Sequence, residues 1–100
     1  MRDKNYKLEL RPLAALEVME AYDWYESQRQ GLGIEFLNEL EIFYDKLLQN
    51  PYSHSYYQKP VRSGKIDRFP YVVIYETFDE VIVVYSIFMA KQNPIKKRTK

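Results

Sequence analysis

The sequence predicts an α+β domain: an N-terminal strand, then an antiparallel helical hairpin packed on one face of a small antiparallel sheet, in the order β-α-α-β-β-β. Two observations predict this class. The first half of the chain carries two stretches of helical apolar spacing, and the second half carries apolar runs of strand length, the strongest at 68–76 and 81–88. With 100 residues, the chain forms one domain, 1–100, around a single core.

The two strongest apolar runs predict a pair of antiparallel strands joined by a hairpin at Asp79 and Glu80. In both runs, odd and even positions are alike apolar. A sheet with one solvated face would instead alternate apolar and polar residues. Both faces of this sheet therefore need a cover, and two helices are enough for only one of them.

The first helix is predicted to follow a short strand at 6–10 and to open at Pro12, because proline is tolerated in the first turn of a helix. One helical stripe is formed by Ala14, Val18, Ala21 and Tyr25, and its small alanines predict a close approach to another element. The acidic residues around this stripe are interpreted as a solvated face, namely Glu17, Glu20, Asp23 and Glu26.

The second helix is predicted from about Ile34 to Asn50, where Pro51 ends it. Gly31 is expected in the left-handed conformation within the short link between the helices, which makes the pair antiparallel. The buried stripe of the second helix has the same spacing as the first and consists of Phe36, Leu40, Phe43 and Leu47. A polar, tyrosine-rich loop at 52–60 and a first strand of the meander at 61–67 follow.

Composition excludes several classes of protein. The chain has no cysteine, so neither a disulfide framework nor a thiolate nucleophile is expected, and no apolar run approaches the roughly 20 residues of a membrane span. The N-terminus does not resemble a signal peptide, which makes the cytoplasm the expected compartment. Residues 1–50 carry a net charge of −4 and residues 51–100 one of +5, so an anionic partner would bind the second half.

Several blocks of the sequence resemble the RelE/ParE toxin superfamily, most closely its ParE-like, plasmid-stabilisation branch. The similarity spans about residues 6–94 and preserves the order and spacing of all the blocks. They include Glu17-Val18, Trp24-Tyr25-Glu26, Gly31-Leu32-Gly33, Glu35-Phe36-Leu37, Asn50-Pro51, Val61-Arg62, Arg68-Phe69-Pro70-Tyr71, and the strand that ends at Lys91-Gln92-Asn93-Pro94.

This resemblance implies the toxin of a type II toxin–antitoxin pair, held inactive by a small cognate antitoxin. In the family, the C-terminal segment of the antitoxin wraps the sheet and the helical hairpin of the toxin, which would supply the missing cover of the second sheet face. The ParE-like branch implies DNA gyrase as an essential target and growth inhibition as the outcome. The family also allows a hetero-oligomer of toxin and antitoxin.

Two other functions remain open: a ribosome-dependent endoribonuclease of the RelE type, and a detoxified member that only binds the antitoxin. RelE-type members use lysines, arginines and a tyrosine to cleave messenger RNA. At the matching positions this chain has Val72 and Gln92 in place of arginines, and Met89 where some branches have histidine. We therefore predict no catalytic residue, no metal and no cofactor.

Two groups of residues are candidates for contact. The cations that could contact a target or a nucleic acid, or could simply be solvated charges on edge strands, are Lys59, Arg62, Lys65, Arg68, Lys91, Lys96, Lys97 and Arg98. The aromatic candidates for antitoxin contact, for which a role in the core is the alternative, are Trp24, Tyr71, Tyr75, Tyr85 and Phe88. The basic tail, 95–100, is a candidate toxic element or a solubilising end, and His54 is expected to be a solvated loop residue.

Overall fold

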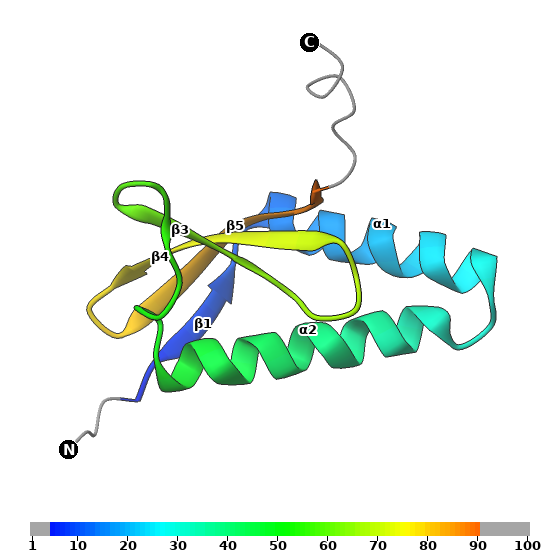
Figure 1. The fold of residues 1–100 in the computed structure, drawn as a ribbon, viewed down its shortest axis with the longest axis horizontal. Coiled ribbons are helices and arrows are strands. Elements are labelled where there is room, and N and C mark those ends of the chain that lie inside the picture. Colours follow the sequence, from blue (N-terminus) through cyan, green and yellow to red (C-terminus); the bar gives the residue numbers. More distant parts are fainter. Residues whose placement is uncertain (1–4, 91–100) are drawn as a thin grey trace, which may run out of the picture.

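A computed structural model describes residues 5–90 of the chain. Its two helices and five strands follow one another as shown in Figure 1. They are β1 (Lys7–Leu10), α1 (Pro12–Gln28), α2 (Leu32–Gln49), β2 (Tyr56–Gln58), β3 (Val61–Lys65), β4 (Tyr71–Phe78) and β5 (Val81–Met89). Within residues 5–90, neither helix combines the length and the apolar character that crossing a bilayer requires.

The five strands form one sheet in the order β1-β5-β4-β3-β2. The predicted α+β class is confirmed, with one difference in pairing. The pairs from β2 to β5 are antiparallel, but β1 runs parallel to β5, with Leu8 opposite Ile82 and Leu10 opposite Val84. Parallel neighbours need a long connection, and the helical hairpin is part of that connection. The sheet is therefore mixed.

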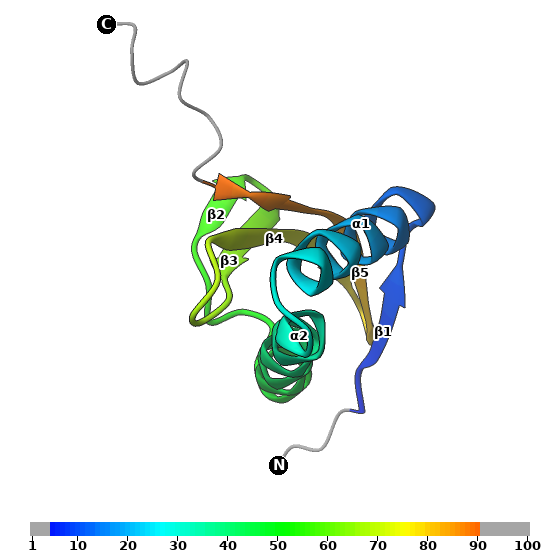
Figure 2. The same ribbon diagram turned by 90° about the vertical axis from the view of Figure 1, so that its right-hand side faces the viewer.

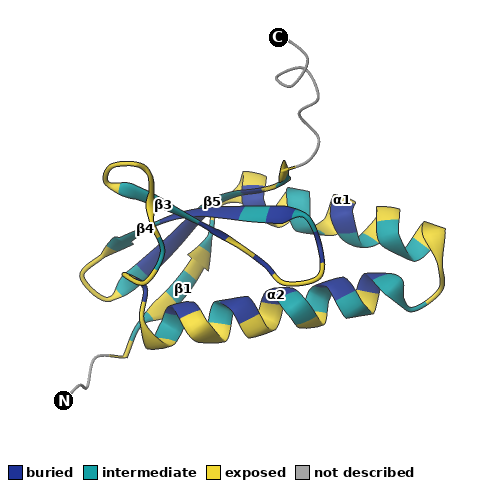
Figure 3. Ribbon diagram, viewed as in Figure 1, coloured by how far each residue is buried: buried dark blue, intermediate teal, exposed yellow. Residues whose placement is uncertain are grey.

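Both helices lie on the same side of the sheet, as Figure 2 shows along their axes. The predicted stripe of α2 is buried throughout, with exposures of 0–5%. Figure 3 shows this buried band along the inner side of the hairpin. The main core joins side chains of both helices to one face of the sheet, and its strand residues include Tyr71, Val73, Tyr75, Ile82, Val84 and Ile87.

Small residues allow the helices to approach the sheet closely. Ala14 and Ala21 are buried in the core on α1, as their size predicted. On β3, a Cβ atom at Gly64 would lie 2.7 Å from the ring of Phe43, so the glycine provides the space in which that ring packs. Larger side chains at these positions would push the two layers apart.

The link between the helices is fixed by Glu26, near the end of α1. Its carboxylate accepts a hydrogen bond from Gly31 N–H (2.8 Å) and one from Gly33 N–H (2.9 Å). Backbone N–H groups at a helix start lack partners within the helix, and a negative charge there is favourable. Gly31 has the predicted left-handed backbone, with φ of 91°. Glu26 of the Trp-Tyr-Glu block thus caps the Gly-Leu-Gly block.

Glu17 closes part of a sheet edge. β1 pairs with β5 only as far as Leu10 and Val84. Beyond that point, the Glu17 carboxylate accepts hydrogen bonds from Ile87 N–H (2.7 Å) and from the Ser86 hydroxyl (2.9 Å). The interpretation of the acidic residues of α1 as a solvated face is therefore wrong for Glu17 and Glu26, because each carboxylate satisfies backbone donors that sequence spacing does not reveal.

Two boundaries also differ from the prediction. The loop at 52–60 contains the short strand β2, whose three residues are all exposed and whose pairing with β3 is irregular, so no apolar alternation marks it. The strand predicted from Arg68 begins at Tyr71, because Arg68 adopts a positive φ of 71° and Pro70 follows it. The predicted β4–β5 turn is confirmed, with Asp79 in the left-handed region (φ 48°).

We predict that Glu26→Gln lowers the free energy of unfolding by about 1 kcal/mol. An amide offers a single oxygen to the two N–H donors, and the substitution removes the negative charge at the start of α2. Chemical denaturation of the purified chain measures the change. Glu20→Gln is the matched control, since Glu20 is exposed on the same helix. Equal effects of the two substitutions would contradict the capping role of Glu26.

Candidate partner-binding surface

The second face of the sheet, opposite the helices, carries a band of apolar side chains on β4 and β5. The register places Val72 beside Phe88, Ile74 beside Ser86 and Phe78 beside Val81. Among the described residues, no helix or strand lies over this face (Figure 2). We call these residues, together with Val83 and Tyr85, the second-face band. The prediction that the helices cover only one face is confirmed.

Exposure varies along the second-face band. Phe78 is 48% exposed and Phe88 is 39% exposed, whereas Ile74 and Val83 are only 7% and 6% exposed. Tyr85 helps to screen the middle of the band, because its hydroxyl donates a 2.8 Å hydrogen bond to Glu76 on the neighbouring strand. This hydrogen bond raises the pKa of Tyr85. The accessible apolar surface is therefore concentrated toward the two ends of the band.

Two of the predicted antitoxin contacts, Tyr71 and Tyr75, belong to the core instead. Tyr75 is 0% exposed and its hydroxyl donates to Pro51 C=O at 2.8 Å. Tyr71 is 8% exposed and its ring centroid lies 5.1 Å from that of Phe36. Burial raises the pKa of both, that of Tyr75 to about 12. Odd-numbered residues of β4 face the helices, so neither ring offers surface to a partner in this conformation.

The three other aromatic candidates lie on two separate surfaces. Tyr85 and Phe88 are on the second-face band, and Trp24, 53% exposed, is on α1. A further apolar groove lies between the two helices and has a volume of about 370 Å³. It is lined by Val18, Met19, Tyr22, Asp23, Ile34 and Leu37. The sequence signal for this groove is a set of apolar residues on α1 outside the predicted stripe, since Leu13, Leu16 and Met19 are all exposed.

Arg68 is held by carboxylates of α2. It pairs with Glu35 at 2.9 Å and with Glu39 at 3.5 Å, and Arg29 pairs with the same Glu35 at 3.4 Å. The hydrogen bond between Arg68 and Glu35 raises the pKa of the guanidinium and lowers that of the carboxyl. This charge is therefore neutralised within the chain, and Arg68 is poorly placed to bind a phosphate.

The other candidate cations within the described residues lie at the β2–β3 end of the sheet. Arg62 donates to His54 C=O (2.7 Å) and to the Tyr56 hydroxyl (3.0 Å), and its guanidinium lies 4.1 Å from the Tyr56 ring centroid. The Lys59 ammonium lies 5.2 Å from the same centroid. Lys65 is exposed at the end of β3. The remaining cationic candidates lie outside the described residues, and they are Lys91, Lys96, Lys97 and Arg98.

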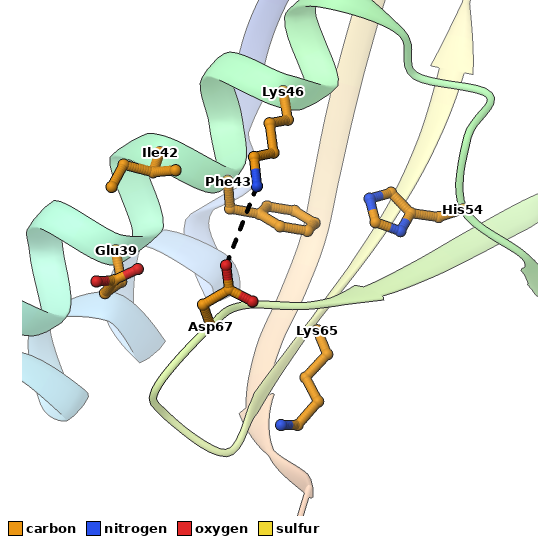
Figure 4. A pocket seen from close by; sticks show the side chains of 7 residues that line it. All are labelled: Glu39, Ile42, Phe43, Lys46, His54, Lys65 and Asp67. Carbon is orange, nitrogen blue, oxygen red and sulfur yellow. Dashed lines mark ion pairs between the residues drawn. The ribbon is translucent and has the colours of Figure 1, made fainter.

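A small cavity of about 150 Å³ lies between α2 and β3 (Figure 4). Its lining consists of Glu39, Ile42, Phe43, Lys46, His54, Lys65 and Asp67. Lys46 and Asp67 approach to 4.0 Å across it. The two cations and two carboxylates of the lining balance each other, so the cavity has no net charge with which to select an ion.

His54 is partly buried, which differs from the solvated position expected for it. Its ring centroid lies 5.2 Å from that of Phe43 and 6.2 Å from that of Tyr75. Burial lowers its pKa, and the positive charges of Arg62 and Lys46 lower it further. Within residues 5–90, no group of three or more His, Cys, Asp or Glu side chains could hold a metal ion.

Comparison with known proteins gives the fold independently. No protein-family model and no curated protein sequence matches the chain. Among solved structures, it is similar to a chain of the structure named "Chromosomal ParDE TA system from P. aeruginosa", with a TM-score of 0.73 and 17% sequence identity. The similarity covers 85% of this chain and 96% of that one. The chain has a ParE-like fold. The resemblance noted in its sequence blocks is confirmed at the level of the fold.

Two of the three positions considered for a nuclease lie on strands, and the third, Gln92, lies outside the described residues. Val72 lies on the second face of β4, and Met89 is the last residue of β5. Of the candidate cations, Arg68 pairs with two carboxylates, whereas the guanidinium of Arg62 lies over the ring of Tyr56.

We predict that the free energy of unfolding decreases as the pH is lowered from about 7 through the ordinary His pKa of 6.5. Because the folded-state pKa of His54 is depressed, the unfolded chain binds more protons in this range. The loss levels off below the folded-state pKa of His54. Denaturation at several pH values measures the slope, and NMR titration of the imidazole measures the pKa.

His54→Gln is the control for this slope, because glutamine does not titrate. The variant should have a flatter stability profile between about pH 7 and the point where carboxyl groups begin to titrate. An unchanged slope in the variant, or an imidazole pKa at or above 6.5, would contradict the depressed pKa of His54.

Proposed function

We propose that the chain is the toxin of a type II toxin–antitoxin module of the ParE-like kind, acting in the cytoplasm and neutralised by a cognate antitoxin. In this proposal the toxin binds and inhibits an essential target, with DNA gyrase as the leading candidate. The fold similarity supports this class of function. The observation that carries the proposal is the second-face band, an apolar sheet surface with no covering element among the described residues.

The exposed rings of the band favour a polypeptide as the cover. Phe78 and Phe88 lie on different strands near opposite ends of the band. A partner must therefore extend along the strands to bury both of them. An antitoxin segment that folds on binding can cover such an elongated surface, although ordering it lowers the affinity per unit area.

Inhibition by binding is favoured over catalysis. The RelE-type arginines are replaced by Val72 and Gln92 in the sequence, and Arg68 is paired with Glu35 and Glu39. A nuclease of the RelE type needs cations that are free to stabilise a pentavalent phosphate. We therefore place the toxic effect in occupation of a target's surface.

Expression of the chain alone should stop growth, and co-expression of the antitoxin from the adjacent reading frame should restore it. The double variant Phe78→Glu/Phe88→Glu should remain toxic but lose neutralisation, because two carboxylates would be buried under the antitoxin. Its affinity for the antitoxin should fall by at least about tenfold. Growth curves and pull-down of the antitoxin measure the two effects.

Ile42→Glu is the matched control, since Ile42 is 46% exposed on α2, on the other side of the sheet. It should keep both toxicity and neutralisation. Antitoxin binding that survives the double variant would contradict the second-face band as the binding site. A chain that binds the antitoxin tightly yet never affects growth would be a detoxified member, and the toxin proposal would be withdrawn.

The target is tested with purified components. The chain should inhibit supercoiling by DNA gyrase, and the antitoxin should relieve that inhibition. Primer extension on cellular messages after induction provides the control for the RelE mechanism, in which cuts appear at defined codon positions. Such cuts, together with unaffected gyrase, would replace the proposed target with the ribosome.

A further inference from the structure

The segment from Asn50 to Ile66 concentrates positive charge and exposed tyrosine. It contains Lys59, Arg62 and Lys65 and no acidic residue. Three of its tyrosines are exposed, Tyr52 by 53%, Tyr56 by 46% and Tyr57 by 59%. Aromatic rings beside cations, with no carboxylate among them, are the features with which proteins bind single-stranded nucleic acids.

Arg62 gathers part of this segment into one surface. Its guanidinium lies 4.1 Å from the ring centroid of Tyr56 and 5.4 Å from that of Tyr52. Hydrogen bonds to His54 C=O and to the Tyr56 hydroxyl fix its orientation. The Lys59 ammonium lies 5.2 Å from the Tyr56 ring. We call Tyr52, Tyr56, Lys59 and Arg62 the tyrosine–arginine platform.

We propose that the tyrosine–arginine platform binds single-stranded nucleic acid. Bases stack on the exposed tyrosine rings, and phosphates contact Lys59 and the N–H groups of Arg62 that its two internal hydrogen bonds leave free. A guanidinium has five N–H donors, so donors remain after those two bonds. Because Arg62 is already oriented by the protein, little side-chain freedom is lost when it contacts a phosphate.

The platform lies apart from the second-face band. Arg62 is opposite Tyr75 in the β3–β4 register, and Tyr75 faces the helices. The platform therefore sits on the helix side of the sheet, next to the segment that follows α2. A partner on the second-face band would leave it accessible, so nucleic-acid binding and antitoxin binding can be tested separately.

An acidic peptide is the main rival ligand, and the rings distinguish it from a nucleic acid. A carboxylate would use Lys59 and Arg62 but would gain nothing from the flat faces of Tyr52 and Tyr56. Base stacking, in contrast, is lost when a ring is removed. The property to measure is therefore the loss of affinity when a tyrosine ring is removed, in addition to the loss when a charge is removed.

Fluorescence anisotropy of the purified full chain, with labelled oligothymidylate and oligouridylate of about ten nucleotides, tests the proposal. At low salt both oligonucleotides should bind, and the ratio of their dissociation constants reports whether DNA or RNA is preferred. Tyr52→Ala and Tyr56→Ala should each weaken binding by on the order of tenfold. Tyr56→Phe should retain it, because the ring remains. Lys59→Gln should reduce the slope of log affinity against log salt by about one.

Two control variants match these changes. Tyr57 is exposed on the same strand, but the rings over which Arg62 and Lys59 lie are those of Tyr52 and Tyr56. Lys7→Gln removes the same charge from an exposed position on β1, at the other edge of the sheet. Tyr57→Ala should leave both the affinity and the salt slope unchanged, and Lys7→Gln should leave the affinity within about twofold of that of the unmodified chain.

Circular dichroism shows whether each variant is folded. If Tyr56→Ala unfolds, Tyr52→Ala and Tyr56→Leu decide the question. Absence of binding at low salt would overturn the proposal. So would binding that all tyrosine variants retain, or equal binding of a labelled polyglutamate. None of these results bears on the growth assay with the second-face variants, so the toxin–antitoxin proposal stands or falls separately.

Discussion

The β4–β5 hairpin is apolar on both faces, and this constraint determines how the rest of the molecule is arranged. One face receives the helical hairpin and becomes the main core, with Val73, Tyr75 and Val84 fully buried. The other keeps Phe78 and Phe88 partly exposed. A domain of this size buries only part of its apolar surface. The helices cover one face of the hairpin, and the second-face band lies on the face that they do not cover.

Much of the acidic charge in the first half of the chain is used internally. Glu26 caps the start of α2, Glu17 closes the edge of β5 beyond β1, and Glu35 holds Arg68 near the start of β4. Each contact joins the helical hairpin to another element or to its own turn. The ion pair between Glu35 and Arg68 uses opposite charges of the two halves to connect them. The segment from Asn50 to Ile66, in contrast, carries Lys59, Arg62 and Lys65 and no acidic residue.

The sequence was sufficient to predict the helices and the main strands, because their apolar periods are clear, and the fold class followed from their order. It could not predict which side of β4 faces the helices. Tyr71 and Val72 are both apolar enough for burial, so alternation carries no information about direction. Tyr71 and Tyr75 therefore stayed candidates both for antitoxin contact and for the core, and the structure places them in the core. The short strand β2 lacked an apolar pattern altogether. Arg68 and Glu35 are in contact although they are 33 positions apart in the sequence. Local residue spacing does not predict contacts over such a sequence separation.

The separation of the second-face band from the tyrosine–arginine platform bears on how such a toxin would be neutralised. Tyr75 connects the two regions: its strand forms the middle of the sheet, its ring is buried beneath the helices, and its hydroxyl holds Pro51 at the start of the platform segment. An antitoxin confined to the second-face band would not cover the platform. If the chain reached its target through nucleic acid bound on the platform, full neutralisation of the chain would require the antitoxin to extend around the β2–β3 edge, or to exclude the target by its bulk. Because β2 is a short edge strand with all three residues exposed, the fold leaves that route open.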